Sequence, residues 1–191
     1  MQKEIFNYLH MESPRLIIRQ WEPSDYEPFA QMNQDSEVMQ YFSKHLTIEE
    51  SNAMIEKSKL MLDEVKYGFW ALEAKEGSEF LGFVALAKVQ FDCPFKGSME
   101  IGWRLKKSAW GKGYATEGAR VLLKYGFEAL EFSEIVSLTA KINLRSSRVM
   151  ERIGMKRNAD DDFNHPKIAP ESPLRPHVLY RISKDKFYGK G

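Results

Sequence analysis

Residues 98–117 of the chain read S-M-E-I-G-W-R-L-K-K-S-A-W-G-K-G-Y-A-T-E. In the first part of this stretch apolar side chains occupy every second position, which predicts a β-strand over 98–105. Gly111 and Gly113 follow in a short loop, and an apolar helical period then runs from about Ala115 to about Leu130. The stretch therefore predicts a strand, a glycine loop and a helix in direct succession.

Such a junction can bind a phosphate group, because the first turn of a helix presents unpaired N–H groups and the positive end of the helix dipole. The two glycines also let the backbone approach a ligand closely. The loop matches neither the Walker pattern nor the dinucleotide-binding fingerprint. A plain strand-to-helix turn therefore stays open as the alternative to a phosphate site.

Glu100 lies in the middle of the predicted strand. Strand alternation places Glu100, Gly102 and Arg104 on one face, opposite the apolar side chains. A carboxylate beside a glycine in mid-strand indicates a bulge or the wall of a cleft. The alternative is an exposed strand face on which Glu100 pairs with Arg104.

A second polar face lies on the helix that ends before Gly154. Asn143, Ser146 and Met150 are three and seven residues apart, so they share one side of that helix. Asparagine is also a favoured N-cap residue. Asn143 is therefore either a helix cap or a ligand-binding residue on this pattern.

The remaining pattern completes the order of elements outward from this stretch. Further strands are predicted over 15–21, 69–75, 80–89, 135–140 and 177–183. Capping-box pairs at Ser24/Glu27 and Thr47/Glu50 predict a short helix and a longer one. Residues 160–175 are polar and rich in proline, which predicts a long loop. We expect one α/β domain over residues 1–191 with a mixed sheet, and an N-terminal arm over 1–10.

Composition narrows the class of protein. The chain has 191 residues, of which 43% are apolar and 29% charged, so a disordered or collagen-like chain is excluded. The formal net charge of +1 gives no general attraction to nucleic acid or to an anionic membrane. No apolar run approaches the roughly 18 residues that span a bilayer. Cys93 is the single cysteine and the four histidines are scattered, so we expect a cytoplasmic protein without a metal site.

Taken together, the motifs resemble the GNAT superfamily of acetyl-CoA-dependent N-acetyltransferases. Within it the chain is most similar to the ribosomal-protein-alanine N-acetyltransferases and their relatives. The segments that carry the resemblance are 15–19 (RLIIR), 100–103 (EIGW), 110–117 (WGKGYATE), 143–146 (NLRS) and 151–155 (ERIGM). The resemblance implies a central mixed, mostly antiparallel sheet with splayed middle strands, flanked by helices.

The resemblance also implies that acetyl-CoA is the cosubstrate. The loop that wraps the pyrophosphate would comprise Trp110, Gly111, Lys112, Gly113, Tyr114, Ala115 and Thr116. The strand residues Trp103, Arg104 and Leu105 would pair with the pantetheine arm like an added strand, and Asn143 and Ser146 would contact it from the other side. Family loops commonly open with Gln or Arg where this chain has Trp110, so we expect the backbone to hold the phosphates.

The implied reaction moves an acetyl group to a primary amine by direct attack in a ternary complex. Glu100 occupies the position of a catalytic glutamate in several members, so we expect it to act as general base. A backbone N–H near Trp103 would support the developing oxyanion. Many members have a tyrosine where this chain has Met150, and Ser146 is the nearest hydroxyl on that face. Ser146 is therefore either the proton partner of the thiolate or only a lining residue.

The acceptor cleft of the family lies between the early helices and the last strands. This nominates Trp21, Asp35, Phe42, Trp70, His165 and His177, together with residues 160–165 and Arg175. The aromatic side chains among them either line the cleft or belong to the core, and the core is the commoner place for them. The acidic run 160–162 either attracts a cationic acceptor or forms a solvated loop. A protein N-terminus, a polyamine-like metabolite and an aminoglycoside-like drug stay open as acceptors, and a homodimer stays open as well.

Two other functions compete with catalysis. The first is a CoA-binding sensor without activity, which the missing tyrosine suggests and Glu100 opposes. The second is an RNA-binding protein that uses Lys106, Lys107 and Lys112, or Arg145, Arg148 and Arg152. The balanced net charge weighs against nucleic acid as a partner.

Overall fold

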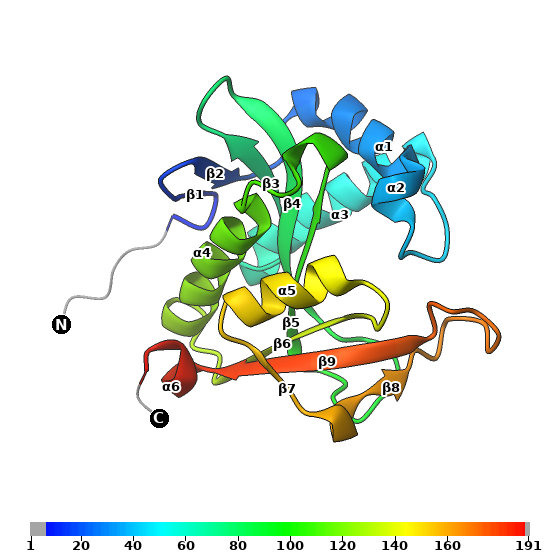
Figure 1. The fold of residues 1–191 in the computed structure, drawn as a ribbon. Coiled ribbons are helices and arrows are strands. Elements are labelled where there is room, and N and C mark those ends of the chain that lie inside the picture. The colour runs from blue at the N-terminus through cyan, green and yellow to red at the C-terminus, as the bar shows by residue number, and fades with distance from the viewer. Residues whose placement is uncertain (1–6, 190–191) are drawn as a thin grey trace.

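The computed structural model describes residues 7–189, and one twisted sheet runs through them (Figure 1). Its strands are β1 (His10–Glu12), β2 (Leu16–Arg19), β3 (Phe69–Ala74), β4 (Glu79–Lys88), β5 (Met99–Leu105), β6 (Glu134–Ala140), β7 (Lys156–Arg157), β8 (Phe163–Asn164) and β9 (Pro176–Ser183). They pair in the order β1-β2-β3-β4-β5-β6-β9-β7, and β8 also pairs with β9. All pairs are antiparallel except β5 with β6, which confirms the predicted mixed, mostly antiparallel sheet.

Helices cover both faces of this sheet (Figure 1). They are α1 (Tyr26–Gln34), α2 (Ser36–Met39), α3 (Ile48–Val65), α4 (Tyr114–Glu128), α5 (Leu144–Arg152) and α6 (Lys184–Phe187). Strand β4 shows the two layers, because its successive side chains point to opposite faces. Val84 and Leu86 belong to the core cluster that contains the apolar face of α4, whereas Phe83 and Ala85 belong to the cluster under α1 and α3.

Helices α3 and α5 begin directly after the capping residues that the sequence predicts, Thr47 and Asn143. The Thr47 hydroxyl accepts from the Glu50 backbone N–H and the Glu50 carboxylate accepts from the Thr47 N–H, so α3 opens on the predicted capping box. Asn143 caps α5 through its Oδ1 atom, which accepts from the Ser146 N–H at 3.2 Å. The alternative of a capping role for Asn143 is thus confirmed.

The predicted capping box at Ser24 and Glu27 is wrong. The box is formed two residues earlier, by Glu22 and Asp25, around a short 3-10 turn over Pro23–Asp25. The reason lies in the preceding strand, since the guanidinium of Arg19 on β2 donates to both oxygens of Asp25 at 2.7 and 3.0 Å and fixes that carboxylate. Helix α1 then starts at Tyr26.

The predicted N-terminal arm lies partly outside the described residues. Within them, the chain from residue 7 onward lies against the sheet. The Tyr8 carbonyl accepts from Trp70 Nε1 at 2.6 Å, and β1 begins at His10. The expected loop over 160–175 contains the two-residue strand β8, which pairs with β9.

Candidate active site

The two middle strands of the sheet meet at a single point. Strands β5 and β6 are paired only at Glu100 and Val136, whereas the neighbouring pairs β4–β5 and β6–β9 each run for seven residues. The Ser137 hydroxyl donates to the Ile101 carbonyl at 2.8 Å and fastens the strands next to this point. Beyond it the strands diverge, so the backbone of Gly102 and the residues after it faces a gap rather than a partner strand.

A cavity of about 560 Å³ opens beside the diverging ends of the strands. It is lined by the end of β5, the glycine loop, the first turn of α4 and one side of α5. The residues predicted to hold acetyl-CoA that line it are Trp103, Arg104, Leu105, Trp110, Gly111, Gly113, Tyr114, Ala115, Thr116, Asn143 and Ser146. The strand-loop-helix junction and the polar face of α5 therefore meet at one site, which we call the donor cavity.

The glycine loop leaves backbone donors free at the donor cavity. Gly111 and Gly113 have φ angles of 75° and 84°, a left-handed conformation that strongly favours glycine. Gly113 is the N-cap of α4, and no side chain caps that helix. The first N–H groups of the helix are therefore available to an anion, and the dipole of a 15-residue helix adds to that site.

A positive side chain lies at the mouth of this loop, although it does not come from Trp110 itself. The Arg145 guanidinium carbon lies over the Trp110 ring at 4.5 Å from its centroid. Arg145, Arg148 and Arg152 all line the donor cavity from α5, so three cations lie near the backbone donors of the loop. Lys112 is exposed and does not line the cavity, but its carbonyl accepts from Arg15 Nη1 at 3.0 Å.

A second cavity of about 510 Å³ lies on the α1–α3 side of the sheet, and we call it the acceptor cavity. Its floor is the β5 face that carries Glu100, Gly102 and Arg104. Residues that line both cavities are Tyr41, Phe42, Trp103, Arg104, Asn143 and Ser146. The two cavities therefore adjoin at the gap between β5 and β6.

Glu100 is a carboxyl group without a counter-charge. No hydrogen bond or ion pair joins Glu100 to another residue in the described part of the chain, and burial raises its pKa to about 7. The alternative in which Glu100 pairs with Arg104 is wrong, because four residues of extended strand separate their Cα atoms by roughly 13 Å. A carboxyl group with a pKa near the ambient pH suits a general base.

The amide of Asn143 and the hydroxyl of Ser146 reach the junction of the cavities from α5. Asn143 Nδ2 donates to the Thr139 hydroxyl at 3.0 Å while its Oδ1 caps the helix. These bonds fix the amide in one orientation and leave its second N–H group available. Tyr41 brings another hydroxyl to the same junction from the loop after α2.

The residues nominated for the acceptor divide into two groups. Phe42, His165 and His177 line the acceptor cavity. Burial lowers the pKa of both histidines, whose rings lie 4.9 Å apart, and so favours their neutral forms. Trp21 and Trp70 are at most 3% exposed.

The two tryptophans belong to the core, where each indole N–H group bonds a backbone carbonyl of another segment. Trp21 Nε1 donates to the Phe69 carbonyl at 2.7 Å and Trp70 Nε1 donates to the Tyr8 carbonyl. The core alternative therefore holds for both tryptophans, and neither contacts the acceptor cavity. Asp35 caps α2 by accepting from the N–H groups of Glu37 and Val38, and it lines neither cavity.

The acidic run 160–162 is largely neutralised by arginines. Arg157 Nε donates to Asp162 at 2.8 Å, and Arg181 Nε donates to Asp161 at 3.0 Å. None of the three aspartates lines the acceptor cavity. The interpretation of this run as an attractor for a cationic acceptor is therefore wrong.

Sequence reasoning missed several residues that line the cavities. Tyr41 and Lys167 were not singled out, and Arg145, Arg148 and Arg152 were considered only as an RNA-binding patch. The three arginines are spaced by three and four residues, which places them on one side of the helix that Asn143 begins. This spacing could have assigned them to the donor side. Within residues 7–189, no group of three His, Cys, Asp or Glu residues is arranged to hold a metal ion. No helix in this part is long and apolar enough to cross a membrane.

Comparisons with known proteins agree with this geometry. Residues 15–156 match the family model of the acetyltransferase (GNAT) domain. The Bacillus subtilis protein "Uncharacterized N-acetyltransferase YnaD" is 29% identical over 150 residues, which are 78% of this chain and 84% of that protein. The Aspergillus fumigatus protein "FsC-acetyl coenzyme A-N(2)-transacetylase" is 32% identical over 125 residues, 63% of this chain and 52% of its own length.

A solved structure shows the same fold over nearly the whole chain. The GNAT-family acetyltransferase of Bacillus anthracis superposes with a TM-score of 0.74 at 27% identity, covering 92% of this chain and 99% of its own. Because the family model spans most of the chain, the strand-loop-helix junction is that of a known enzyme class. The chain belongs to the GNAT family of acetyltransferases and is an N-acetyltransferase.

Proposed function

We propose that the protein transfers an acetyl group from acetyl-CoA to a primary amine by direct attack in a ternary complex. The observation that carries this proposal is the position of Glu100, an unpartnered carboxyl group in the acceptor cavity, beside the gap through which the two cavities adjoin. The donor residues fit acetyl-CoA, since uncapped N–H groups and α5 arginines suit phosphates. The side of β5 that lacks a partner strand beyond the β6 pairing suits the amides of pantetheine.

Acetyl-CoA supplies a thioester whose carbon bonds to the acceptor nitrogen while the carbon–sulfur bond breaks. Glu100 accepts the proton that the nitrogen must lose, directly or through a water molecule. An α-amino group with a pKa of about 7.7–8.0 is neutral roughly one time in ten at pH 7, and a lysine amine only about once in a few thousand. A base with a pKa of about 7 is therefore useful for the first kind of acceptor and close to essential for the second.

Two further groups complete the proposed chemistry. A backbone N–H near Trp103, on the unpaired part of β5, donates to the carbonyl oxygen as negative charge develops there. Ser146 lies where both cavities meet, and its hydroxyl donates a hydrogen bond or a proton to the leaving thiolate. A thiolate of ordinary pKa leaves with little help, so the Ser146 role is the smaller of the two.

The motif resemblance to ribosomal-protein-alanine N-acetyltransferases suggests a protein N-terminus as the acceptor. This finer assignment rests on motifs that lie in the donor half of the site, such as residues 110–117. The chemical class of the acceptor depends on the residues that line the acceptor cavity. A peptide with an N-terminal alanine belongs in the substrate panel for this reason.

The first experiment is the thermal midpoint of unfolding with and without acetyl-CoA, using NADH as a nucleotide control. A ligand at 100 times its Kd stabilises the folded state by about 2.7 kcal/mol, which moves the midpoint by roughly 5–11 °C for a chain of this size. A shift with acetyl-CoA but not NADH, followed by thiol release with amines, supports the proposal. A shift without thiol release for any amine class favours the sensor, and no shift at millimolar acetyl-CoA overturns the assignment of the donor cavity.

A further inference from the structure

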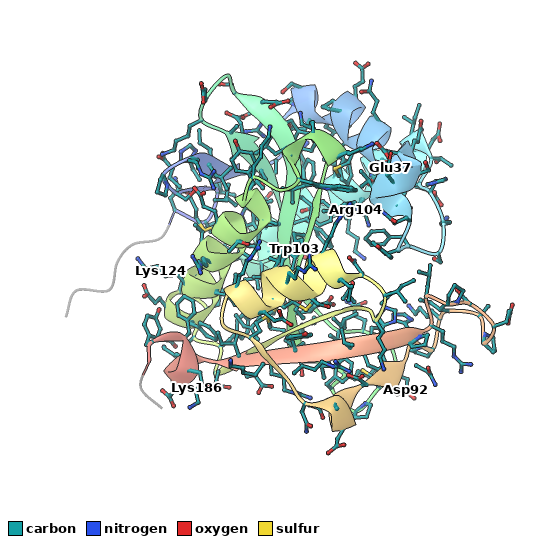
Figure 2. The ribbon with its side chains drawn as sticks, in the orientation of Figure 1. Glu37, Asp92, Trp103, Arg104, Lys124 and Lys186 are labelled. Atoms are coloured by element: carbon teal, nitrogen blue, oxygen red, sulfur yellow. The ribbon has the colours of Figure 1, made fainter. Side chains whose placement is uncertain are left out.

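Arg104 presents a guanidinium group to the acceptor cavity from the same face of β5 as Glu100. Figure 2 labels it below α2, where its side chain lies near the elements that cover this side of the sheet. Its Nη1 atom donates to Asn33 Oδ1 at 2.6 Å, and Asn33 belongs to the fully buried part of α1. The guanidinium is therefore held in place by an uncharged partner.

Arg104 has no acidic partner. No carboxylate lies within ion-pair distance of it in the part of the chain that the structure describes, and its Nε atom is enclosed without an acceptor. Burial lowers its pKa to about 10, so it stays charged at neutral pH. A charge held in this way is unfavourable unless something else compensates it.

Arg19 shows how this protein pairs an arginine that serves the fold. Arg19 donates to both oxygens of Asp25 and, from Nε, to Glu73 at 2.7 Å. Burial alone would lower its pKa, but these bonds outweigh burial and raise it. The contrast indicates that the counter-charge of Arg104 is not part of the fold.

The other charges of the acceptor cavity point the same way. Among the described residues Glu100 is the only acidic one that lines it, and with a pKa of about 7 it is only partly ionised at neutral pH. Lys167 adds a second cation, while burial lowers the pKa of His165 and His177 and favours their neutral forms. The cavity is therefore electrostatically unsuited to a polycationic acceptor and complementary to an acceptor that carries a negative charge.

Two aromatic rings restrict how such a charge can approach. The Arg104 guanidinium carbon lies over the Phe42 ring at 4.0 Å from its centroid and over the Phe83 ring at 5.5 Å. Rings that cover a guanidinium leave its N–H edge as the route for a further contact. A planar carboxylate matches that edge with two parallel hydrogen bonds.

We propose that Arg104 binds a carboxylate of the acceptor, so that the substrate is a small primary amine that also carries a carboxylate. This inference rests on the proposed acetyl transfer and names the substrate class for the same site. The acceptor nitrogen would lie near Gly102, where the cavities adjoin, about two strand residues or roughly 7 Å from Arg104. The backbone of Arg104 keeps its proposed part in the donor cavity, and only its side chain serves the acceptor.

The test uses a series of ω-amino acids from glycine to 6-aminohexanoate, each beside the alkylamine and the diamine of the same chain length. Thiol release gives kcat/KM for every probe. We expect at least one amino acid to exceed its matched alkylamine on the order of 100-fold, because the carboxylate forms charge-assisted bonds with Arg104. The chain length with the highest kcat/KM reports the span between the reacting nitrogen and the guanidinium.

Variants of Arg104 assign this preference to the side chain. Arg104→Gln is expected to reduce the preference to below about 10-fold by raising KM for the amino acid, while KM for acetyl-CoA stays unchanged. Arg104→Lys keeps the charge but loses the paired N–H donors of the guanidinium, so an intermediate preference is expected. This conservative variant also serves if Arg104→Gln does not fold. Lys57→Gln removes an exposed cation from α3 and serves as the matched control.

Several results would overturn the proposal. Alkylamines or diamines that react as well as the amino acids would remove the role of the carboxylate while leaving acetyl transfer intact. A higher kcat/KM for 2-aminoethylphosphonate, or an unchanged preference in Arg104→Gln, would contradict the assignment as well. If acetyl-CoA raises the thermal midpoint but no probe releases thiol, calorimetric binding of the probes to the CoA-loaded enzyme decides. Equal binding to wild type and Arg104→Gln, or no binding, then rejects the carboxylate site.

Discussion

Arg15 and Glu117, which are 102 positions apart in the chain, are joined by three hydrogen bonds or ion-pair contacts. The Arg15 backbone N–H donates to Glu117 Oε1 at 2.9 Å, and its Nε donates to Oε2 at 2.7 Å. The same guanidinium donates to the Lys112 carbonyl. The residue that precedes β2 is thereby tied to both the first turn of α4 and the glycine loop, and it holds that loop from outside the donor cavity.

Glu117→Gln tests this tie. The Ser13 hydroxyl and Arg15 hydrogen-bond the carboxylate and lower its pKa despite the opposing effect of burial, so the charged form is the one that is stabilised. We expect the Kd of acetyl-CoA to rise about 10-fold, since a loosened loop presents its N–H groups less well, with kcat changed less than about 2-fold. Titration calorimetry measures the Kd, and Glu128→Gln at the other end of α4 is the control. An unchanged Kd would show that the loop keeps its shape without Arg15.

Arg145→Gln removes the cation that lies over Trp110. We expect KM for acetyl-CoA to rise about 5- to 20-fold, because an arginine–phosphate contact is lost while the backbone donors of the loop remain. Raising the ionic strength should weaken acetyl-CoA binding less in the variant than in the wild type. Initial rates at two salt concentrations, with Lys57→Gln as the control, measure both effects. Equal salt dependence in the two proteins would place Arg145 outside the phosphate contacts.

Glu100 sets the expected pH dependence of activity. Its pKa of about 7 predicts that kcat/KM falls about tenfold per pH unit below pH 7, as the base becomes protonated. Glu100→Gln should lower kcat/KM at pH 8 by 100-fold or more and abolish this acidic limb. A pH profile from pH 5.5 to 9 with a saturating donor measures both. An acidic limb that persists in the variant would belong to a different group.

The same carboxyl group affects stability with a defined sign. Its pKa is higher in the folded state than the ordinary 4.5, so the folded protein binds the proton more tightly. The resulting stabilisation is present below pH 4.5 and is lost as the pH rises to about 7. Glu100→Gln should therefore exceed the wild type in stability at pH 8 by up to about 3 kcal/mol, with the difference closing toward pH 4.5. Urea unfolding of both proteins at the two pH values checks this.

Arg19→Met and Arg104→Met should change stability in different ways. Arg19→Met leaves the buried Asp25 and Glu73 unpaired, so we expect a loss of about 3–5 kcal/mol. Arg104→Met removes a charge that has no acidic partner, so we expect a loss below about 1 kcal/mol or a gain. Denaturant unfolding measures both. A large loss for Arg104→Met would show that its bond to Asn33 supports the fold.

Local patterns predicted the parts of this enzyme that local chemistry determines. The period of two in β5, the Thr47 capping box and the paired glycines each act over a few residues, and each is found where expected. The strands β7 and β8 are only two residues long, so they have no alternation of apolar and polar residues to detect. They are strands because they pair with β9. The Ser24 capping box failed for the same kind of reason, since Arg19 holds Asp25 from another element.

The residues predicted for the donor gather at one cavity more completely than those nominated for the acceptor. The predicted donor contacts depend on backbone conformation, which Gly111 and Gly113 indicate in the sequence. The acceptor cavity depends on which side chains lack partners, and no local pattern records that. Trp70 was nominated for binding and lies in the core, whereas Arg104 was assigned to the cofactor through its backbone and its side chain faces the acceptor cavity.

The single pairing between β5 and β6 has a consequence for how such an enzyme can diverge. The proposed donor contacts are made by main-chain atoms, which most substitutions leave in place, so Trp110 at the opening of the loop is compatible with them. In the proposed site the acceptor is met by a few side chains on one strand face, Glu100 and Arg104 among them. A substitution of Arg104 would therefore change which amine is bound without changing the contacts to the acetyl donor. The fold thus separates the main-chain contacts to the donor, which tolerate substitution, from the side-chain contacts to the acceptor, which substitution can change.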